Sequence, residues 1–270
     1  MQVTKLRGSV MSPCMTYREH LASQPLEVEL SVVAPMHNEA GGAHGLASEI
    51  SAAVGDLRHE IIFVNDASTD DTEQILEAAQ HEFSQLRVIS HEKKAGQSRA
   101  LRTGILAARA SVIVTLDGDG QNDPADIPAL YRRLKEQEGS VGMVAGERRE
   151  RRDATAKKFA SSIANGVRKS ILNDGADDTG CGLKVFHREA FLRLPYFDHL
   201  HRYLPAMMSR EGYSVVFEPV AHRPRRHGAS KYTNFGRLGV AVRDLIGVTW
   251  LLARSKSPGE ITEKHKKKGF

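Results

Sequence analysis

The first half of the chain alternates short apolar runs with amphipathic stretches. Four apolar runs, each followed by turn or capping residues, lie at 30–35, 60–65, 86–90 and 110–117. Between them, apolar residues recur at helical spacing over 41–57, 69–83 and 96–109. Buried strands that alternate with amphipathic helices are typical of a parallel sheet covered by helices on both faces. The pattern therefore predicts an α/β fold with a mostly parallel central sheet.

The second half continues this pattern less regularly. We expect a helix over 124–137, with Pro124 in its first turn, and a strand over 141–148. The later segments predict a turn, a short strand and a helix within 175–195, a strand within 215–225 and a last helix over 233–256. No internal repeat or obvious linker divides the chain. The expected organisation is a flexible leader over 1–27, one α/β domain over 28–232, and a C-terminal amphipathic helix with a basic tail over 233–270.

The composition narrows the class of protein. A chain of 270 residues with 40% hydrophobic and 26% charged residues is globular, and collagen-like, low-complexity and coiled-coil classes are excluded. Lys and Arg number 38 against 33 Asp and Glu, so the net charge is +5. Such a surplus suits nucleic acid or an anionic membrane. Nucleic acid is the weaker interpretation, because the sequence holds no recognised nucleic-acid motif and only 6% aromatic residues.

Cysteine content and apolar run length indicate the compartment. Cys14 and Cys181 are the two cysteines and lie far apart, so we expect neither a disulfide framework nor a cysteine-rich zinc site. This usage fits a reducing cytoplasm. The longest apolar run, residues 245–253, is far shorter than the roughly 18 to 20 residues that a membrane-spanning helix needs.

Carboxylates follow three of the predicted strands, at Glu39, Asp66 and the pair Asp117 and Asp119. Ligands of parallel α/β sheets bind outside the carboxyl ends of the strands. Two carboxylates one residue apart can reach the same hard cation, and the glycines at 118 and 120 allow close backbone approach. A Mg²⁺ or Mn²⁺ ion held there would neutralise a diphosphate. A plain Asp-Gly turn with solvated carboxylates explains this motif alone about as well.

The other two strand ends are equally open to a second interpretation. Asp66 could accept a hydrogen bond from a nucleobase or ribose, but spacing alone favours Asp66 or Ser68 as the cap of the following helix. Glu39 could hold a ribose hydroxyl or a base edge, or only cap the helix over 41–57. Helix capping is a sufficient explanation for any one of these carboxylates. It explains less well why three strand ends at the same sheet edge all carry a carboxylate.

Four segments together resemble a known family. They are VVAPMHNEA (32–40), IIFVNDASTDDT (61–72), LDGDGQNDP (116–124) and RRHGASKY (225–232). In this order they resemble motifs of the family-2 glycosyltransferases, specifically the polyprenyl-phosphate sugar synthases similar to dolichol-phosphate mannosyltransferase. Asn65 stands where that family usually has the first of two aspartates. Gly118 replaces the usual alanine, a change expected to have little chemical consequence.

The resemblance implies a GT-A, Rossmann-like fold that binds a nucleotide sugar with the help of Mg²⁺ or Mn²⁺. By family position, the donor-binding residues are Pro35, Asn38, Glu39, Asp66, Gly96, Asp117 and Asp178. The implied metal ligands are Asp117, Asp119 and Gln121. The implied catalytic residues are Asp119, Arg148, Arg225 and Lys231, of which the three cations would grip the phosphates of donor and acceptor. The neighbouring Arg151 and Arg152 are better explained as solvated surface.

The family's reaction is attack by a lipid phosphate on the anomeric carbon of the sugar, with inversion and loss of the nucleoside diphosphate. A phosphate monoester is ionised at neutral pH, so no strong general base is required. The expected function is a metal-dependent hexosyltransferase that uses GDP-mannose or a UDP-sugar and a dolichyl or undecaprenyl phosphate acceptor. Two alternatives stay open: a saccharide or other lipid as acceptor, and a non-catalytic nucleotide-binding module at a membrane. A homo-oligomer is also compatible with the sequence.

The C-terminal segment suggests how such a protein would reach a lipid. Apolar residues recur at approximately helical spacing at Phe235, Leu238, Val242, Leu245, Ile246 and Leu252, with Trp250 nearby. A helix lying in the membrane interface and a helix packed on the core both fit this pattern. The basic tail from Arg254 onward favours an anionic membrane surface. We therefore expect a cytoplasmic protein that is peripheral on the inner face of the membrane.

Overall fold

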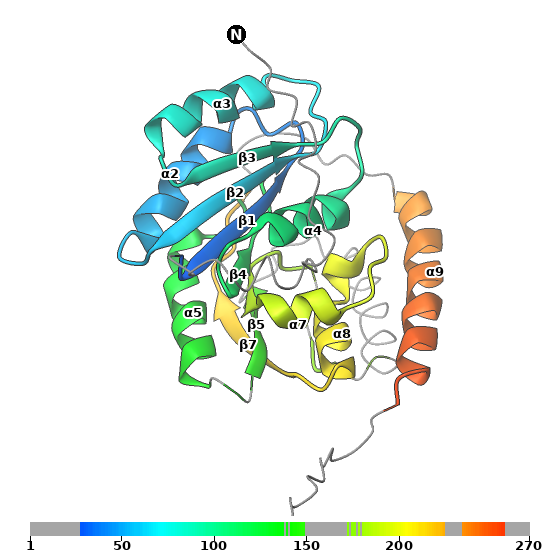
Figure 1. The fold of residues 1–270 in the computed structure, drawn as a ribbon. Coiled ribbons are helices and arrows are strands. Elements are labelled where there is room, and N and C mark those ends of the chain that lie inside the picture. The colour runs from blue at the N-terminus through cyan, green and yellow to red at the C-terminus, as the bar shows by residue number, and fades with distance from the viewer. Residues whose placement is uncertain are drawn as a thin grey trace, which may run out of the picture.

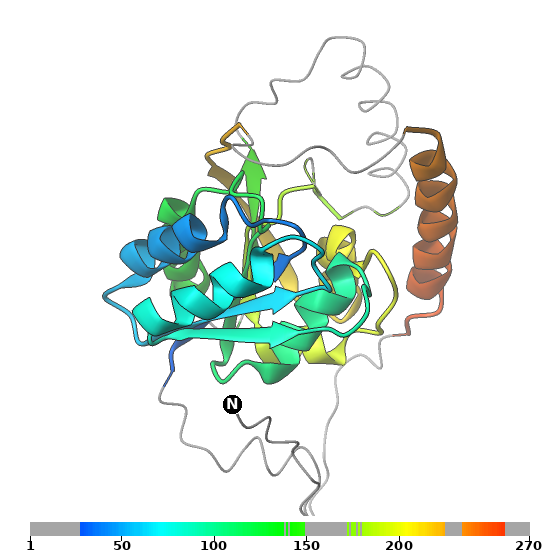
Figure 2. The same cartoon turned by 90° about the horizontal axis from the view of Figure 1, so that it is seen from above.

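The fold is a seven-stranded sheet between two layers of helices, as Figures 1 and 2 show. The computed structural model describes residues 28–137, 139, 141–148, 172, 174–176, 178, 180–224 and 234–256. The strand order is β3-β2-β1-β4-β6-β5-β7. The expected leader, the basic tail beyond residue 256, and the segment with Arg225 and Lys231 lie outside the described residues.

Parallel pairing joins the first four strands, which are β1 (Leu30–Met36), β2 (His59–Asn65), β3 (Leu86–Ser90) and β4 (Val112–Thr115). Each coincides with an apolar run of the sequence, because strands that helices cover on both faces consist largely of apolar residues. On the far side of the sheet, β5 (Val141–Arg148) pairs in parallel with β7 (Ser214–Val220). The predicted mostly parallel α/β fold is thus confirmed.

One strand runs against the others. The four-residue strand β6 (Lys184–His187) lies between β4 and β5 and is antiparallel to both. Its start therefore lies at the same sheet edge as the carboxyl end of β4. This reversal brings Gly182 and Lys184 beside the residues that follow β4, an arrangement that the sequence pattern did not predict.

Helices cover both faces of the sheet. One face packs against α2 (Ala43–Val54), α3 (Thr72–Glu82) and α5 (Ile127–Glu136), which follows the short 3-10 helix η1 (Pro124–Asp126). The other face packs against α4 (Gln97–Ala107), α7 (Arg188–Arg193), α8 (Leu204–Arg210) and α9 (Asn234–Ala253). The sequence did not predict α8 or the 3-10 helix η2 (Leu200–Arg202) before it.

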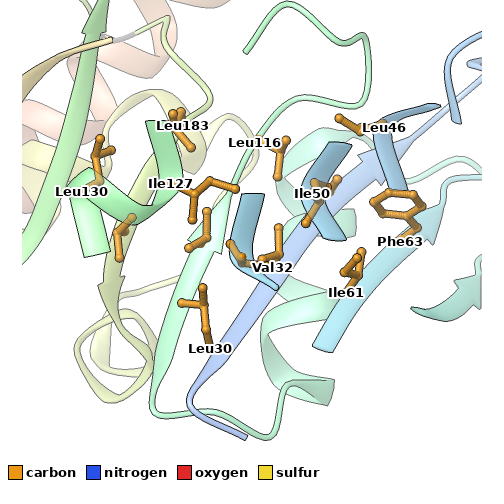
Figure 3. Packing of buried hydrophobic residues seen from close by; sticks show 14 of the residues in the cluster. Leu30, Val32, Leu46, Ile50, Ile61, Phe63, Leu116, Ile127, Leu130 and Leu183 are labelled. Carbon is orange, nitrogen blue, oxygen red and sulfur yellow. The ribbon is translucent and has the colours of Figure 1, made fainter. Parts of the chain in front are cut away.

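Each face has its own apolar core. Figure 3 shows the first core, in which Ile50 of α2 and Ile127 of α5 pack with Val32 of β1. The next residue of β1, Val33, belongs to the second core, since successive side chains of a strand point to opposite faces. All these side chains are fully buried.

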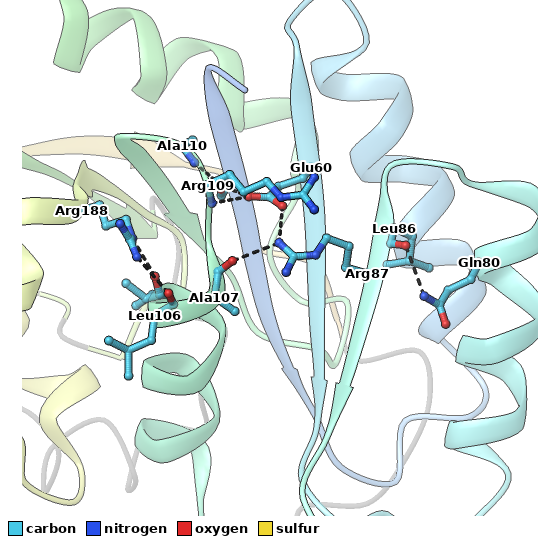
Figure 4. A network of polar contacts seen from close by, with 11 residues as sticks. Glu60, Gln80, Leu86, Arg87, Leu106, Ala107, Arg109, Ala110 and Arg188 are labelled. Atoms are coloured by element: carbon cyan, nitrogen blue, oxygen red, sulfur yellow. Dashed lines mark hydrogen bonds and ion pairs between the residues drawn. The ribbon is translucent and has the colours of Figure 1, made fainter. Parts of the chain in front are cut away.

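A polar network closes the edge of the sheet away from the strands' carboxyl ends (Figure 4). The buried carboxylate of Glu60 accepts hydrogen bonds from the Arg87 guanidinium at 2.5 Å and the Arg109 backbone N–H at 2.6 Å. The Ser31 hydroxyl donates to the same carboxylate at 2.6 Å. Arg87 also donates to the carbonyl oxygen of Ala107, at the end of α4. A buried charge is tolerated here because it is paired and hydrogen-bonded.

The last helix, α9, has apolar side chains packed on the core and others that are exposed. Val248 is 1% exposed, and Leu245, Leu251 and Leu252 pack beside it on the second core. Val242, Ile246 and Trp250 are 50%, 66% and 58% exposed, and their spacing of four residues aligns them along the helix. Among the described side chains of α9, apolar residues thus lie on two faces, one against the core and one exposed. Within the described residues, no helix is long and apolar enough to cross a membrane.

Candidate active site

A cavity of about 380 Å³ opens at the carboxyl ends of β1, β2 and β4. Its walls bring together seven of the residues singled out from the sequence, which are Pro35, Glu39, Asp66, Gly96, Asp117, Asp119 and Gln121. They come from four separate segments, and the parallel strands place these segments at one edge of the sheet. The expected clustering of strand-end carboxylates is therefore present.

Asp117 is held from three directions. Its carboxylate accepts a hydrogen bond from Gln97 Nε2 at 2.7 Å, and its backbone N–H donates to Asn122 Oδ1 at 3.0 Å. Gly182 packs so closely that a Cβ atom there would lie 2.5 Å from the carboxylate carbon of Asp117. Burial and the charge of Asp119 raise the pKa of Asp117 to about 6, against the opposing charges of Lys184 and Arg148. The two carboxylates thus repel each other.

This arrangement fits a divalent cation. A cation between Asp117 and Asp119 would remove the like-charge repulsion that raises the pKa of Asp117. Gln121 lines the same wall, and its backbone N–H donates to Asp119 Oδ1 at 3.1 Å. Across the described part of the chain, no group of three or more His, Cys, Asp or Glu is placed to hold a metal ion. A Mg²⁺ or Mn²⁺ ion held by Asp117, Asp119 and Gln121 would complete its coordination with phosphate and water oxygens, as Mg²⁺ commonly does.

Gly118 is more constrained than its sequence position suggested. A Cβ atom at this position would lie 2.5 Å from the carbonyl oxygen of Pro35 and 2.7 Å from Met36 Sδ. Glycine at this position therefore has a packing role in this chain, beside the chemical equivalence expected from the sequence. The residue after β4 contacts the backbone of β1 so closely that alanine would require one of the two segments to move.

Asp66 organises the loop that leads into α4. Its carboxylate accepts hydrogen bonds at 2.8 Å from the His91 ring and from the backbone N–H groups of Ala95 and Gly96. Burial raises the pKa of Asp66, but these bonds outweigh it and the net shift is downward. The Asp66 side chain does not cap the next helix, α3. Asp70, four residues further along, accepts from the Thr72 backbone N–H in the first turn.

The N-cap residue of α2, Gly42, has no side-chain capping bond, and the Glu39 carbonyl oxygen accepts from the Gly42 and Ala43 backbone N–H groups at 3.0 Å. Asn38 adopts a φ of 54° and binds the next loop, where its Oδ1 accepts from the Thr69 backbone N–H at 2.7 Å. The hydroxyl of Ser68 accepts from the Asn38 backbone N–H, so Ser68 does not cap α3 either. Glu39 lines the cavity, whereas Asn38 does not.

Arg148 and Asp178 form a pair outside the cavity lining. Two hydrogen bonds join them, from Arg148 Nε to Asp178 Oδ2 at 2.5 Å and from Arg148 Nη2 to Oδ1 at 2.7 Å. The bonds to Asp178 raise the pKa of Arg148. The carboxylate thus engages two of the guanidinium nitrogens, and the predicted phosphate-binding role of Arg148 stays a prediction. Arg225 and Lys231, the other two predicted cations, lie outside the described residues, as do Arg151 and Arg152.

Sequence reasoning missed several residues of the cavity wall. Lys184 of β6 is 3% exposed and donates a hydrogen bond to the Cys181 carbonyl oxygen. Burial lowers the pKa of Lys184, while the charges of Cys181, Asp117 and Asp178 oppose this shift. A lysine inside the apolar run LKVF was the available signal. Gln97, which holds Asp117, carried no comparable signal, because glutamine in the first turn of a helix is unremarkable.

A mostly parallel sheet with paired carboxylates at its carboxyl edge is the arrangement of the GT-A class of α/β proteins. Residues 31–194 match the profile described as glycosyl transferase family 2, and the chain belongs to this family. It is 32% identical over 244 residues to "Dodecaprenyl-phosphate galacturonate synthase" of Rhizobium johnstonii, covering 86% of this chain and 70% of that protein. The resemblance inferred from the four motifs is thereby confirmed.

Other comparisons agree. "Undecaprenyl-phosphate 4-deoxy-4-formamido-L-arabinose transferase" of Klebsiella pneumoniae is 30% identical over 229 residues, covering 84% of this chain and 69% of that protein. Among solved structures, glucosyl-3-phosphoglycerate synthase from Mycobacterium tuberculosis in complex with Mn²⁺, UDP and its product matches with a TM-score of 0.64 at 19% identity, covering 93% of this chain and 88% of that one. This structural likeness confirms the GT-A-like fold.

Proposed function

We propose that this protein transfers a sugar from a nucleotide-diphosphate sugar to a polyprenyl phosphate, with inversion at the anomeric carbon. The observation that carries the proposal is the convergence of Asp66, Asp117 and Asp119 on one cavity at the carboxyl edge of the sheet. Membership of glycosyl transferase family 2 supports the reaction class. The names of the two relatives, which are dodecaprenyl- and undecaprenyl-phosphate enzymes, support the acceptor class.

Glu39 and Asp66 would lie beside the nucleoside of the donor, while Asp117, Asp119 and Gln121 would hold Mg²⁺ or Mn²⁺. When bound, the cation would neutralise the negative charge that develops on the departing diphosphate. Gln97 and Asn122 keep Asp117 in place, so this carboxylate need not reorganise on binding. An acceptor phosphate is already ionised at neutral pH, so the chain has to align it and needs no strong base.

The exposed side of α9 supports a peripheral position on the cytoplasmic face of a membrane. Val242, Ile246 and Trp250 are the large apolar side chains that stand exposed among the described residues, and all three belong to this helix. Arg254 lies over the Trp250 ring at 5.6 Å, which places a cation at the same end of the helix. An apolar stripe with neighbouring cations suits an anionic lipid surface. This position would bring the cavity near a lipid-borne acceptor.

A thermal-shift screen of nucleotide sugars tests the donor. We expect UDP-glucose, UDP-galacturonate, another UDP-sugar or GDP-mannose to raise the Tm, and the rise to require Mn²⁺ or Mg²⁺. Failure of every nucleotide diphosphate to shift the Tm would refute donor binding. The successful donor, radiolabelled in its sugar, is then incubated with undecaprenyl phosphate, and label should appear in the lipid fraction.

Substitution of a metal carboxylate separates an enzyme from a binding module. Asp119→Ala should abolish transfer in the radiolabel assay, because a single carboxylate would remain for the cation. Unimpaired transfer by this variant would contradict the catalytic role of Asp119. Wild-type protein that binds the donor and transfers it to no acceptor would indicate the non-catalytic module.

A further inference from the structure

Three Lys or Arg side chains line the cavity within the described residues, and two of them already have partners. Lys94 Nζ lies 2.9 Å from the ring nitrogen Nε2 of His37, and Lys184 donates to the Cys181 carbonyl oxygen. The third is Arg202, whose guanidinium makes no hydrogen bond or ion pair with any described residue. A cation that faces a cavity without a carboxylate partner is suited to an anionic ligand.

The backbone around Arg202 is fixed before any ligand binds. Arg202 ends η2, and its backbone N–H donates to the His199 carbonyl oxygen at 3.0 Å. On one side, the backbone N–H of His201 donates to the Ser98 hydroxyl at 3.2 Å, and the His201 ring lies 2.7 Å from the same oxygen. On the other side, Tyr203 is buried in the second core. Ligand binding at Arg202 therefore has to order the side chain but not the backbone that carries it.

Contacts of α4 connect the segment of Arg202 with the paired carboxylates, which line the same cavity. Gln97 holds Asp117, and the next residue, Ser98, holds His201, the neighbour of Arg202. Gly96, one residue earlier, donates to Asp66 at the proposed nucleoside end. The start of α4 therefore contacts three parts of one cavity wall, which are Asp66, Asp117 and the segment of Arg202.

The segment that carries Arg202 is also bound to α9. The ring of His199 contacts Asp244 of α9, with 2.6 Å between Nδ1 and Oδ2, and the Asp244 side chain is 11% exposed. Arg202 thus lies in a wall that is supported by the helix with the exposed apolar stripe. A lipid-borne acceptor would reach the cavity from this helix if α9 meets the membrane.

We infer that Arg202 is the cation that receives the phosphate of the acceptor, an inference that rests on the proposed function. Its planar fork can bind two phosphate oxygens and offset the repulsion between acceptor and donor phosphates. Arg148, in contrast, is paired with Asp178 and does not line the cavity. In the reaction, an oxygen of the acceptor phosphate bonds to the anomeric carbon. The bond from that carbon to the diphosphate breaks, and its electron pair leaves with the nucleoside diphosphate, so no proton transfer is needed.

Steady-state kinetics of Arg202→Gln and Arg202→Lys test this assignment. Both variants are assayed with undecaprenyl phosphate and the donor found by the thermal-shift screen. For Arg202→Gln we expect the KM for the lipid phosphate to rise by about 10- to 100-fold. This is the change in affinity expected when a hydrogen bond between two charged groups is lost. Its donor KM and its affinity for the nucleoside diphosphate with Mn²⁺, measured by calorimetry, should stay within about twofold. Arg202→Lys should recover part of the loss, because lysine keeps the positive charge. The recovery should be incomplete, because lysine cannot bind two phosphate oxygens as the planar guanidinium does.

The matched control is Arg99→Gln. The substitution removes the same charge from the neighbouring helix. Arg99 itself stacks on the Tyr196 ring at 3.8 Å and does not line the cavity. This variant should keep both KM values. An unchanged lipid KM in Arg202→Gln would overturn the inference, as would a loss confined to nucleoside diphosphate affinity, which would assign Arg202 to the donor. A wild-type protein that transfers no sugar to the lipid is a separate result. It would refute the proposed function, and Arg202 would then have no acceptor phosphate to bind.

Discussion

At the scale of single residues, Gly182 shows how tightly the carboxylate wall is packed. A Cβ atom there would overlap the carboxylate of Asp117. Gly182→Ala should therefore displace Asp117 and weaken binding of the nucleoside diphosphate with Mn²⁺ by about 10- to 100-fold, the range seen when support of a metal ligand is lost. Isothermal titration calorimetry measures this affinity directly.

The control for this substitution is Gly45→Ala in α2. A Cβ atom at Gly45 would meet nothing within 4 Å, so binding should be unchanged. Since alanine favours a helix interior, the free energy of unfolding should rise by about 0.5–1 kcal/mol. If Gly182→Ala and the wild-type protein bind the nucleoside diphosphate with equal affinity, the structure around Gly182 can accommodate a methyl group without displacing Asp117.

His201 makes stability depend on pH. Burial is the largest cause that holds the pKa of His201 well below 6.5, with the nearby Arg202 charge acting in the same direction. The unfolded chain takes up a proton at His201 near pH 6.5, whereas the folded protein does not. Stability from this residue is therefore present above about pH 6.5 and is lost as the pH falls below it. Urea unfolding at pH 7.5, 6.5 and 5.5 should show a shallower decline in His201→Gln than in the wild-type protein.

The strand-end carboxylates could be found from sequence because each follows an apolar run that ends at the same sheet edge. Their supporting residues could not. Gln97 and Gly182 act only through a fold that brings a helix start and a strand start to Asp117. Asp66 and Ser68 were favoured as helix caps from spacing, but the loop of residues 91–96 and Asn38 use them instead. Local spacing does not contain these longer-range contacts.

At the scale of secondary-structure elements, the buried pair of Glu60 and Arg87 ties β2 to β3 and to the end of α4. Arg87→Met leaves the Glu60 carboxylate, whose side chain is 4% exposed, without its charged partner. We expect the free energy of unfolding to fall by about 1–3 kcal/mol, less than for a fully buried pair because the Arg87 side chain is 32% exposed. Chemical denaturation measures the loss.

The matched control is Arg58→Met, which breaks the exposed pair between Arg58 and Glu29. Their side chains are 70% and 39% exposed, so the expected change is below about 0.5 kcal/mol. Equal losses in the two variants would contradict the importance assigned to burial of Glu60.

The elements themselves differ in how far their sequences determine them. The parallel strands have continuous Val and Ile runs, and their positions were predicted to within two or three residues. The short strand and helix within 175–195 were also expected, but the antiparallel direction of β6 depends on its pairing with β4 and β5. The helix α8 has seven residues and Pro205 in its first turn, too short a segment to show a helical period.

At the scale of the whole molecule, α9 presents its exposed apolar stripe away from the sheet. The double variant Ile246→Ser with Trp250→Ser should lose co-sedimentation with vesicles that contain anionic phosphatidylglycerol, because both side chains would leave the apolar part of the interface. Vesicles of phosphatidylcholine alone should bind the wild-type protein more weakly. Gln74→Ser, an exposed substitution in α3 on the opposite face of the sheet, serves as the control. Unchanged binding by the double variant would exclude α9 as the docking element.

The reversed direction of β6 has a consequence for how such proteins can diverge. The chain leaves β5 at Arg148 and enters β6 at Lys184, and both points lie at the edge of the sheet where the cavity opens. The connection between these strands therefore starts and finishes at the same edge of the sheet. Substitution of Gly180, a described residue of this connection that lines the cavity, could alter what the cavity admits while the pairing of β6 with β4 and β5 is kept.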